Sequence, residues 1–336
     1  YYVAGLFLFI LLFFFLPIKG KKYEIGIPVK HLDERDTMFS RNEIKPGEER
    51  FNEYYKLRPE HKAPDDKFRS KPGLLEEGTT YFNRMAFAVA DASFEAVEAF
   101  FDLRSKNDGM RRTTNDKGHG SIDLTIFIKE WARKMGAHSV GIAEMKDYHF
   151  YTVGGRKERY GKPVENKHKY GIALTVEMDY ELTSTGPQAP VVMESARQYL
   201  NSGMIATQLA LTLRNLGYDA TTHIDANYDV ICPLVAKDAG LGEIGRMGLL
   251  MTPGLGPRAR IAVVTTDAPL LQDTPTHSDS VIDFCTKCKK CAHVCPSAAI
   301  PLDDRKQHYG GFHWQINQEA CFTYWCTAGT DCGKCM

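Results

Sequence analysis

The residues with the most evident chemistry in this chain are its cysteines. Four of them are spaced as C-x2-C-x2-C-x3-C, at Cys285, Cys288, Cys291 and Cys295, and Pro296 follows directly. Two-cluster ferredoxins bind iron–sulfur cubanes with this spacing: three close thiolates bind one cluster, and the fourth reaches the other. The sequence therefore predicts iron–sulfur clusters and the transfer of single electrons.

A second set of cysteines supplies the remaining candidate ligands, at Cys321, Cys326, Cys332 and Cys335. The ferredoxin crossover assigns the second cluster to Cys295, Cys321, Cys332 and Cys335. Cys326 is then spare, although it could replace Cys321. The first cluster keeps Cys285, Cys288 and Cys291, and we expect its fourth thiolate beyond Met336.

Two other uses of cysteine are less consistent with this pattern. Paired CxxC motifs are typical of zinc ribbons, but zinc gives no reason for three cysteines at CxxCxxC followed by x3-C-P. A secreted disulfide scaffold would spread its cysteines along a shorter chain, whereas eight of the nine lie between Cys285 and Cys335.

The elements that must position these cysteines are mixed. Apolar periodicity predicts helices over 81–101, 124–135 and 193–216, and strands over 139–143, 170–176 and 260–266. Helices interleaved with short strands predict a layered α/β or α+β body that precedes a cysteine domain near Phe284.

Composition and the N-terminal residues bear on partners. The 336 residues are 43% hydrophobic and 25% charged, with net charge +0 and a pI near 7.3, so no basic excess favours a nucleic-acid partner. The first 18 residues carry no charge, and Lys19, Lys21 and Lys22 follow. We expect a membrane helix within residues 1–22, rather than a signal peptide, with the rest anchored on the cytoplasmic side.

Residues 23–80 are rich in charge and proline, which predicts an extended segment that wraps a larger body. A disordered linker is the alternative. Aromatic residues argue against it, at Phe51, Tyr54, Tyr55 and Phe68.

A glycine-rich loop follows the long predicted helix. Gly240, Gly242 and Gly245 match G-x-G-x-x-G, and Gly248 continues the series. A dinucleotide-binding fingerprint requires a strand directly before the motif, and Lys237-Asp238 interrupts the upstream run. The loop instead indicates a close approach to a large cofactor or, alternatively, a purely structural turn.

Several segments together resemble one family, the corrinoid-dependent reductive dehalogenases. They are 191–200 (VVMESARQYL), 213–220 (LRNLGYDA), 239–257 (AGLGEIGRMGLLMTPGLGP) and 283–300 (DFCTKCKKCAHVCPSAAI), with 36–41 and 54–74 resembling its N-terminal segment. The resemblance implies an α+β fold: a nitroreductase-like core over 81–280 binding a base-off corrinoid, then a ferredoxin-like domain over 281–336 with two 4Fe–4S clusters. It also implies that the clusters reduce cobalt to Co(I), which breaks a carbon–halogen bond of an organohalide.

The resemblance also implies roles for particular side chains. Tyr199 would donate the proton, helped by a cation at Arg258 or Arg260, with Arg258 narrowly preferred. Asn227 would contact corrinoid or substrate, and Gly240, Gly242, Gly245 and Gly248 would let the corrinoid approach. The plainer interpretations are a core aromatic residue, surface arginines and a turn asparagine.

The chain departs from this family in two respects, and two other functions remain as alternatives. The last ligand of the first cluster is missing up to Met336, and no twin-arginine signal is visible while a hydrophobic segment lies in the same chain. The electron donor therefore stays open among ferredoxin, flavodoxin, quinol and a reductase. An epoxyqueuosine-reductase-like enzyme of tRNA modification shares this core, and an electron-transfer subunit without catalysis would need only the clusters. The sequence does not name the organohalide.

Overall fold

The computed structural model describes residues 22–24, 31–105, 120–275, 278–308 and 311–336, together with Tyr2, Gly5 and Phe7. The membrane helix predicted within residues 1–22 therefore lies almost wholly outside the described residues and stays a prediction. Across the described ranges, no helix is both long enough and apolar enough to cross a membrane.

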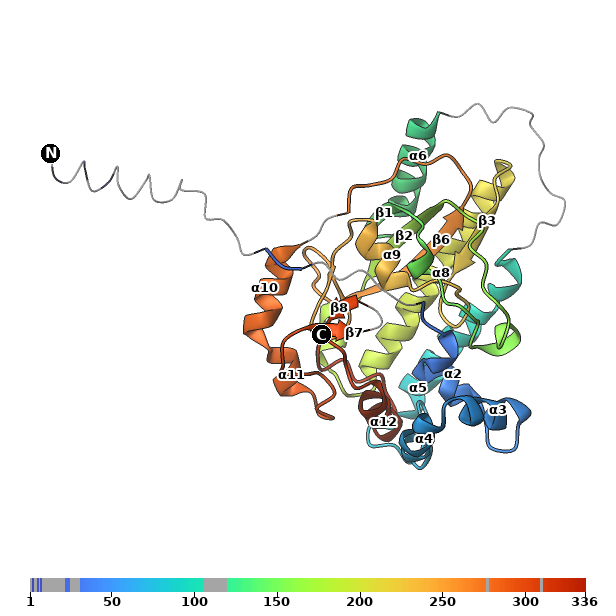
Figure 1. The fold of residues 1–336 in the computed structure, drawn as a ribbon, viewed down its shortest axis with the longest axis vertical. Coiled ribbons are helices and arrows are strands. Elements are labelled where there is room, and N and C mark those ends of the chain that lie inside the picture. Colours follow the sequence, from blue (N-terminus) through green and yellow to red (C-terminus); the bar gives the residue numbers. More distant parts are fainter. Residues whose placement is uncertain are drawn as a thin grey trace.

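A four-stranded sheet forms the centre of the fold (Figure 1). Its order is β1-β2-β6-β3 and every neighbouring pair is antiparallel. The strands are β1 (Ser139–Glu144), β2 (Tyr170–Glu177), β3 (Ala220–His223) and β6 (Ala259–Thr266). Three of them confirm predicted strands, and β3 was not foreseen.

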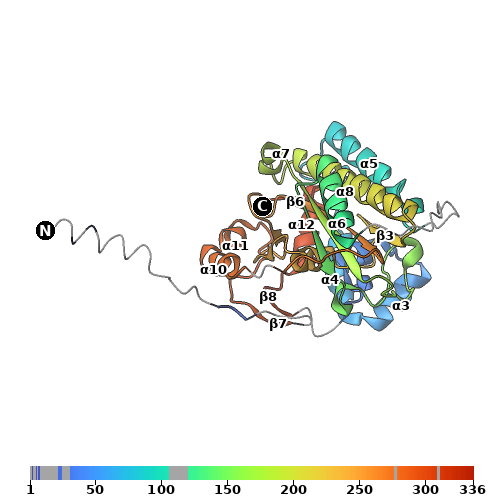
Figure 2. The ribbon, with the colours of Figure 1, turned by 90° about the horizontal axis from the view of Figure 1, so that it is seen from above.

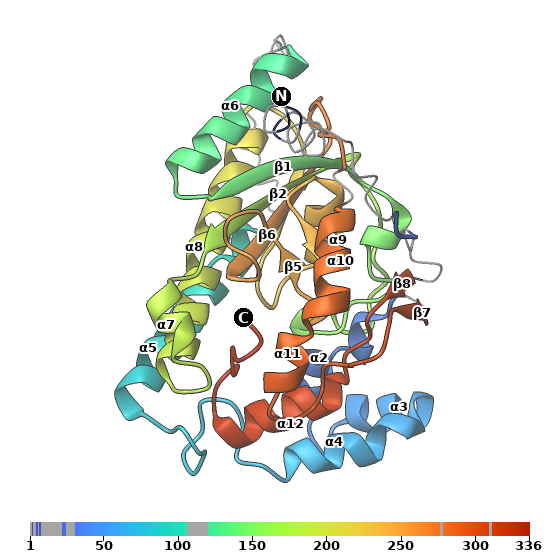
Figure 3. The same ribbon diagram turned by 90° about the vertical axis from the view of Figure 1, so that its left-hand side faces the viewer.

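Both faces of this sheet are buried. Successive side chains of a strand point to opposite faces. In β2, Ile172 and Leu174 join the core cluster that includes residues of α6 (Ser121–Lys134) and α8 (Pro190–Asn215). Ala173, between them, joins the cluster of α9 (Cys232–Asp238) on the other face. Figure 3 shows α6 and α8 on one side of the sheet and α9 on the other.

The three predicted helices are present. They are α5 (Arg84–Glu98), α6 and α8, and α5 packs along α8 on the outside (Figure 2). Pro190 occupies the first turn of α8, where a missing N–H costs nothing. Gly217, at φ +89°, follows its C-terminus in the left-handed conformation that glycine adopts readily.

The N-terminal segment is helical, so the prediction of an extended segment was wrong. Its elements are η1 (Glu34–Asp36), α2 (Met38–Glu43), α3 (Glu49–Leu57), η2 (Pro59–His61) and α4 (Lys62–Arg69). Two of the prolines that suggested an extended chain lie in first turns, Pro59 of η2 and Pro64 of α4, where helices tolerate them. Each longer helix buries an aromatic side chain, Tyr54 in α3 and Phe68 in α4.

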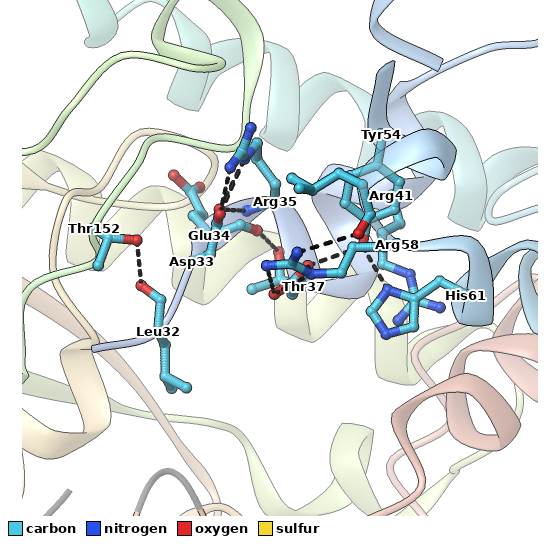
Figure 4. Close-up of polar contacts among 12 residues, drawn as sticks. Leu32, Asp33, Glu34, Arg35, Thr37, Arg41, Tyr54, Arg58, His61 and Thr152 are labelled. Atoms are coloured by element: carbon cyan, nitrogen blue, oxygen red, sulfur yellow. Dashed lines mark hydrogen bonds and ion pairs between the residues drawn. The ribbon is translucent and has the colours of Figure 1, made fainter. Parts of the chain in front are cut away.

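Polar contacts hold this segment to itself and to the core (Figure 4). Arg58 pairs with Asp36 at 3.1 Å, and the Tyr54 hydroxyl lies 2.7 Å from His61 Nδ1. The Thr152 hydroxyl donates to the Leu32 carbonyl at 3.4 Å. The segment is therefore an ordered part of the body.

The cysteine segment packs on both earlier parts. Its elements are α10 (Asp279–Cys288), α11 (Lys290–Val294), β7 (Lys306–His308), β8 (Gly311–His313) and α12 (Gln318–Ala328). Helix α12 lies against α4, where the rings of Phe322 and Phe68 meet edge to face at 5.2 Å.

The remaining elements are η3 (Phe101–Leu103), η4 (Asp147–His149), η5 (Lys157–Arg159), α7 (Tyr180–Ser184), β4 (Glu243–Ile244) and β5 (Leu250–Met251).

Candidate functional site

Four cysteines from three parts of the chain face one cavity of about 420 Å³. They are Cys295, Cys321, Cys332 and Cys335, the set expected for the second cluster. Burial, with smaller contributions from the nearby Cys321 and Cys332 thiols, raises the pKa of Cys335 to about 12, which places these sulfurs close together. Cys326 does not line this cavity: it is 2% exposed and packs with Phe68 and Phe322, as a spare cysteine should.

The first three cysteines form a second group behind this cavity. Cys285 and Cys288 belong to α10 and Cys291 to α11, and Lys289 joins the two helices in a left-handed turn at φ +52°. Burial raises the pKa of Cys291, and Cys285 and Cys288 raise it further, so the three thiols are neighbours. Cys288 is exposed. The expected fourth ligand beyond Met336 stays a prediction.

The surroundings of Cys295 favour a metal-binding thiolate. Burial raises the pKa of Cys295, but hydrogen bonds from Ser297 and from the Ala299 N–H outweigh it and lower that pKa below its usual value. The thiolate is the form that binds metal, so Cys295 is prepared as a ligand.

A second cavity, of about 230 Å³, adjoins the first. The two share the lining residues Phe39, Tyr151, Tyr199, Tyr228, Leu249 and Arg260. Phe39 comes from α2, so the N-terminal segment forms part of the wall. A mainly apolar and aromatic lining with a few converging polar groups is typical of a cofactor or ligand site.

Tyr199 and Arg260 lie together in this lining. The Arg260 guanidinium carbon is 4.9 Å from the centre of the Tyr199 ring. Burial raises the pKa of Tyr199 above its usual value, and the positive charge of Arg260 opposes that rise. Tyr199 therefore stays protonated at neutral pH, next to a cation that stabilises the phenolate once the proton has left.

Arg260 is held from the opposite side. Its Nη2 donates to Asp331 at 2.8 Å and to the Ser195 hydroxyl at 2.6 Å, and Ser195 donates to the same carboxylate. Asp331 directly precedes Cys332. Arg260 Nε and Asp331 Oδ1 are buried without a hydrogen-bond partner. Such unpaired atoms beside a cavity indicate where a bound molecule would place polar groups.

Arg258 lies elsewhere, so the preference for this arginine does not fit the structure. It pairs with Glu177 at 3.2 Å, donates to the Met178 carbonyl and covers the ring of Tyr180 at 5.5 Å. Arg258 precedes β6, whereas Arg260 lies within the strand and faces the cavity. Sequence separation from Tyr199 did not distinguish two arginines that are two residues apart.

Asn227 lies in a turn and does not line either cavity. Its N–H donates to the Ile224 carbonyl at 3.0 Å, and its carbonyl accepts from the Ile224 N–H at 3.2 Å. Ala226 takes φ +58° to close this turn. The neighbours Asp225 and Tyr228 face the cavity instead. The turn interpretation therefore fits Asn227 better than a cofactor contact.

The glycine loop contains a tight hairpin of β4 and β5. A helix, α9, precedes it instead of a strand, so the context of a dinucleotide fingerprint is missing. A side chain at Gly242 would meet the Met251 carbonyl at 2.3 Å, so the turn itself requires this glycine. Gly240 and Gly248 have positive φ, and Gly245 abuts Met251. The loop nevertheless reaches the cavity through two larger side chains, Met247 and Leu249.

Several lining residues could not be found from sequence patterns. Phe39, Tyr151 and Tyr228 are distant in sequence from one another and from the cysteines; Phe39 lies in the 36–41 segment that resembles the family, but nothing there marked it as a lining residue. Asp331 could have been noticed from the sequence, because it directly precedes Cys332, a predicted cluster ligand.

Comparisons with known proteins agree with this geometry. The model of the 4Fe-4S dicluster domain matches residues 284–336. A tetrachloroethene reductive dehalogenase of Desulfitobacterium hafniense is 36% identical over 262 residues, covering 64% of this chain and 47% of that protein. A solved catabolic reductive dehalogenase in complex with 3-bromo-4-hydroxybenzoic acid has a TM-score of 0.73 and 25% identity, covering 95% of this chain and 43% of its own.

The similarity to the main alternative is weaker. An epoxyqueuosine reductase of Pseudomonas aeruginosa is 23% identical over 207 residues, covering 53% of this chain and 55% of that protein.

Fold and cysteines together define a 4Fe–4S dicluster protein with a mixed helix and sheet body. More narrowly, the chain is similar in sequence and in fold to the reductive dehalogenases, the family that its sequence segments resemble. It spans about half the length of the curated relatives that it matches.

Proposed function

We propose that this chain carries the catalytic site of a corrinoid-dependent reductive dehalogenase. One observation carries the proposal: the cavity lined by the four second-cluster cysteines is also lined by Tyr199 and Arg260. Electrons and a proton can therefore reach the same space. Reductive dehalogenation requires both in one place. An organohalide takes up two electrons and one proton, a C–H bond replaces the carbon–halogen bond, and a halide ion leaves.

The lining suits a corrinoid. A nitroreductase-like core and a ferredoxin-like domain would enclose it between Tyr199, the loop residues Met247 and Leu249, and the second cluster. Its flat ring would contact mainly apolar and aromatic side chains, and Arg260 Nε offers an unpaired donor. When bound, the corrinoid would supply the reduced cobalt that breaks the carbon–halogen bond.

The chain's own residues then handle the proton and the charge. The Tyr199 hydroxyl donates a proton to the carbon that loses the halogen. Arg260 stabilises the resulting phenolate, and Asp331 and Ser195 hold the guanidinium in place. Phe39, Tyr151 and Tyr228 would exclude water and contact the substrate.

Electrons would arrive through the first cluster, because its ligand Cys288 is exposed. They would pass to the second cluster and from there into the cavity. Anchoring on the cytoplasmic face of a membrane, through the apolar residues before Lys19, would bring the protein near its electron donor.

Halide release tests this function. The protein is purified anaerobically with both clusters and corrinoid, reduced chemically and given a panel of chlorinated and brominated organic compounds. We expect halide release that requires corrinoid. Reduction of epoxyqueuosine in tRNA without halide release would support the tRNA-modification alternative, and a protein that binds clusters but no corrinoid would support an electron-transfer subunit.

A further inference from the structure

Arg246 is a fully buried arginine beside the first cysteine group. It directly follows Gly245 in the glycine loop and is 0% exposed. Its Nε donates to the Cys285 carbonyl at 2.9 Å, and its Nη1 donates to the Pro301 and Asp303 carbonyls at 2.7 Å each. The guanidinium also lies 4.7 Å from the centre of the Trp314 ring.

The positive charge of Arg246 has no anionic partner among the described residues. All its hydrogen bonds go to backbone carbonyls, the fourth being a weak one to Thr286 at 3.5 Å. Arg41, which is also fully buried, shows the usual arrangement: it pairs with Asp65 at 2.5 Å and with Glu319 at 2.6 Å. Burying an unpaired charge is costly, so an anion should lie near Arg246.

Two anions are available in principle. The C-terminal end of α10, where the Cys285 and Thr286 carbonyls lie, carries a partial negative charge. A 4Fe–4S cluster held by Cys285, Cys288 and Cys291 would carry a larger one, because its thiolates outweigh the charge of the iron–sulfide core. The carbonyl of a cluster ligand accepts from Arg246, and the Arg246 charge acts on the Cys285 and Cys291 thiols, so the guanidinium lies next to the cluster site.

We propose that Arg246 is the fixed positive charge that balances the first cluster and raises its reduction potential. This inference rests on the clusters of the proposed function. Reduction adds one negative charge to the cluster, and a cation held in a buried, weakly screened position favours the reduced form. Arg246 acts through charge and position and does not touch the substrate.

The role fits the order of the two clusters. The first cluster lies behind the cavity and has the exposed ligand Cys288, so it receives electrons from outside. A higher potential makes it the better acceptor. Arg246 would thereby connect the glycine loop, which bounds the cavity through Met247, to the step at which electrons arrive.

The test is a redox titration of the full-length, anaerobically purified protein, followed by electron paramagnetic resonance. The signal altered by Cys288→Ser is assigned to the first cluster. Arg246→Gln removes the charge, and Arg246→Lys keeps it while losing most of the hydrogen-bond fork. Arg305→Gln is the matched control, because Arg305 lies over the same Trp314 ring at 5.7 Å but is partly exposed.

We expect Arg246→Gln to make reduction of the first cluster at least tenfold less favourable, which corresponds to about 59 mV for a one-electron couple. Arg246→Lys and Arg305→Gln should stay near the wild-type potential, and the second cluster should shift less. An unchanged potential in Arg246→Gln with an intact cluster would show a purely structural role and overturn the proposal.

Loss of the cluster in a variant is also decisive. Loss of the first cluster in Arg246→Gln but not in Arg246→Lys would show that the cluster needs the positive charge at this position, which supports the proposal. Loss in both would indicate that the hydrogen-bond fork matters instead, and would contradict the proposal. The readout is separate from dehalogenation: a shifted potential without halide release would refute the proposed reaction and leave the role of Arg246 standing.

Discussion

Arg260 covers the ring of Tyr199 with its guanidinium carbon 4.9 Å from the ring centre, and Asp331 holds the same guanidinium at 2.8 Å. Asp331 precedes Cys332, a candidate ligand of the second cluster. One short chain of contacts thus joins the proposed proton donor to the loop that would deliver electrons. In the proposed reaction, proton and electron delivery would therefore depend on the same few side chains.

Replacing Arg260 should change both the rate and its pH dependence. Burial raises the pKa of Tyr199 and Arg260 opposes the rise, so Arg260→Gln should raise that pKa further. Activity requires the protonated tyrosine and is lost as pH rises through its pKa. The alkaline limb of the pH–rate profile should therefore move to higher pH, while the maximum rate falls about 100-fold through loss of charge stabilisation.

Arg258→Gln is the matched control for this experiment. Arg258 covers Tyr180 at 5.5 Å, in a similar arrangement outside the cavity lining. The Arg258→Gln substitution should leave the pH–rate profile almost unchanged. A larger loss from Arg258→Gln than from Arg260→Gln would show that the assignment is inverted.

Cys321→Ala and Cys326→Ala should differ in iron content, although both residues lie on α12. Cys321 faces the cavity with the other second-cluster cysteines, whereas Cys326 is buried among Phe68 and Phe322. We expect Cys321→Ala to lose about half of the iron and Cys326→Ala to keep nearly all of it. Iron analysis with electron paramagnetic resonance measures this, and equal losses would remove the distinction between ligand and spare.

Arg41 should matter for stability far more than Arg58. Arg41 and Asp65 form an ion pair in which both side chains are 0% exposed, and Arg41 also binds Glu319 on α12. Arg41→Gln leaves a buried carboxylate unpaired and should cost about 3–5 kcal/mol of unfolding free energy. The ion pair of Arg58 with Asp36 is partly exposed, so Arg58→Gln should lower the unfolding free energy by less than about 1 kcal/mol. Denaturant unfolding compares the two, and similar costs would contradict this account of the N-terminal segment.

His223 should contribute an acid-sensitive part of the stability. Burial, together with the positive charge of Arg104, lowers the pKa of this histidine from 6.5 to about 3. The other charged or titratable groups that act on it are Asp229, His168 and Arg159. Below pH 6.5 the unfolded chain gains a proton that folded His223 does not bind. The unfolding free energy should therefore fall as pH falls from 6.5 toward 3, by up to roughly 1.4 kcal/mol per pH unit.

His223→Gln measures this contribution by difference. The Gln side chain can still accept from the Asp229 N–H and donate to Thr265, as His223 does. The variant should show a shallower loss of stability between pH 7 and pH 5.5, measured by thermal unfolding under anaerobic conditions. Identical slopes in the two proteins would remove His223 as the source.

The sequence predicted best what depends on local patterns. Cysteine spacing identified the two sets of thiols, and periodicity located α5, α6, α8 and three of the four strands of the central sheet. It failed where proline and charge outweighed the helical spacing of aromatic residues, as at Tyr54 and Phe68 in the N-terminal segment.

The site itself was only partly predictable, because its members meet through long-range packing. Tyr199 was found by resemblance, but the choice between Arg258 and Arg260 depended on which one extends into strand β6 and faces the cavity. Phe39 reaches the cavity from the N-terminal segment, and Arg246 becomes notable only because its charge is buried without a carboxylate. Neither relationship is encoded by spacing.

The central claim is that Tyr199 protonates the carbon from which the corrinoid removes halogen. It is tested most directly by halide release from Tyr199→Phe, with cobalt and iron contents matched to the wild type. Tyr180→Phe is the control, since Tyr180 is 68% exposed and also lies beneath an arginine. We predict a rate at least about 100-fold lower for Tyr199→Phe and an unchanged rate for Tyr180→Phe. Full halide release by Tyr199→Phe would contradict the account.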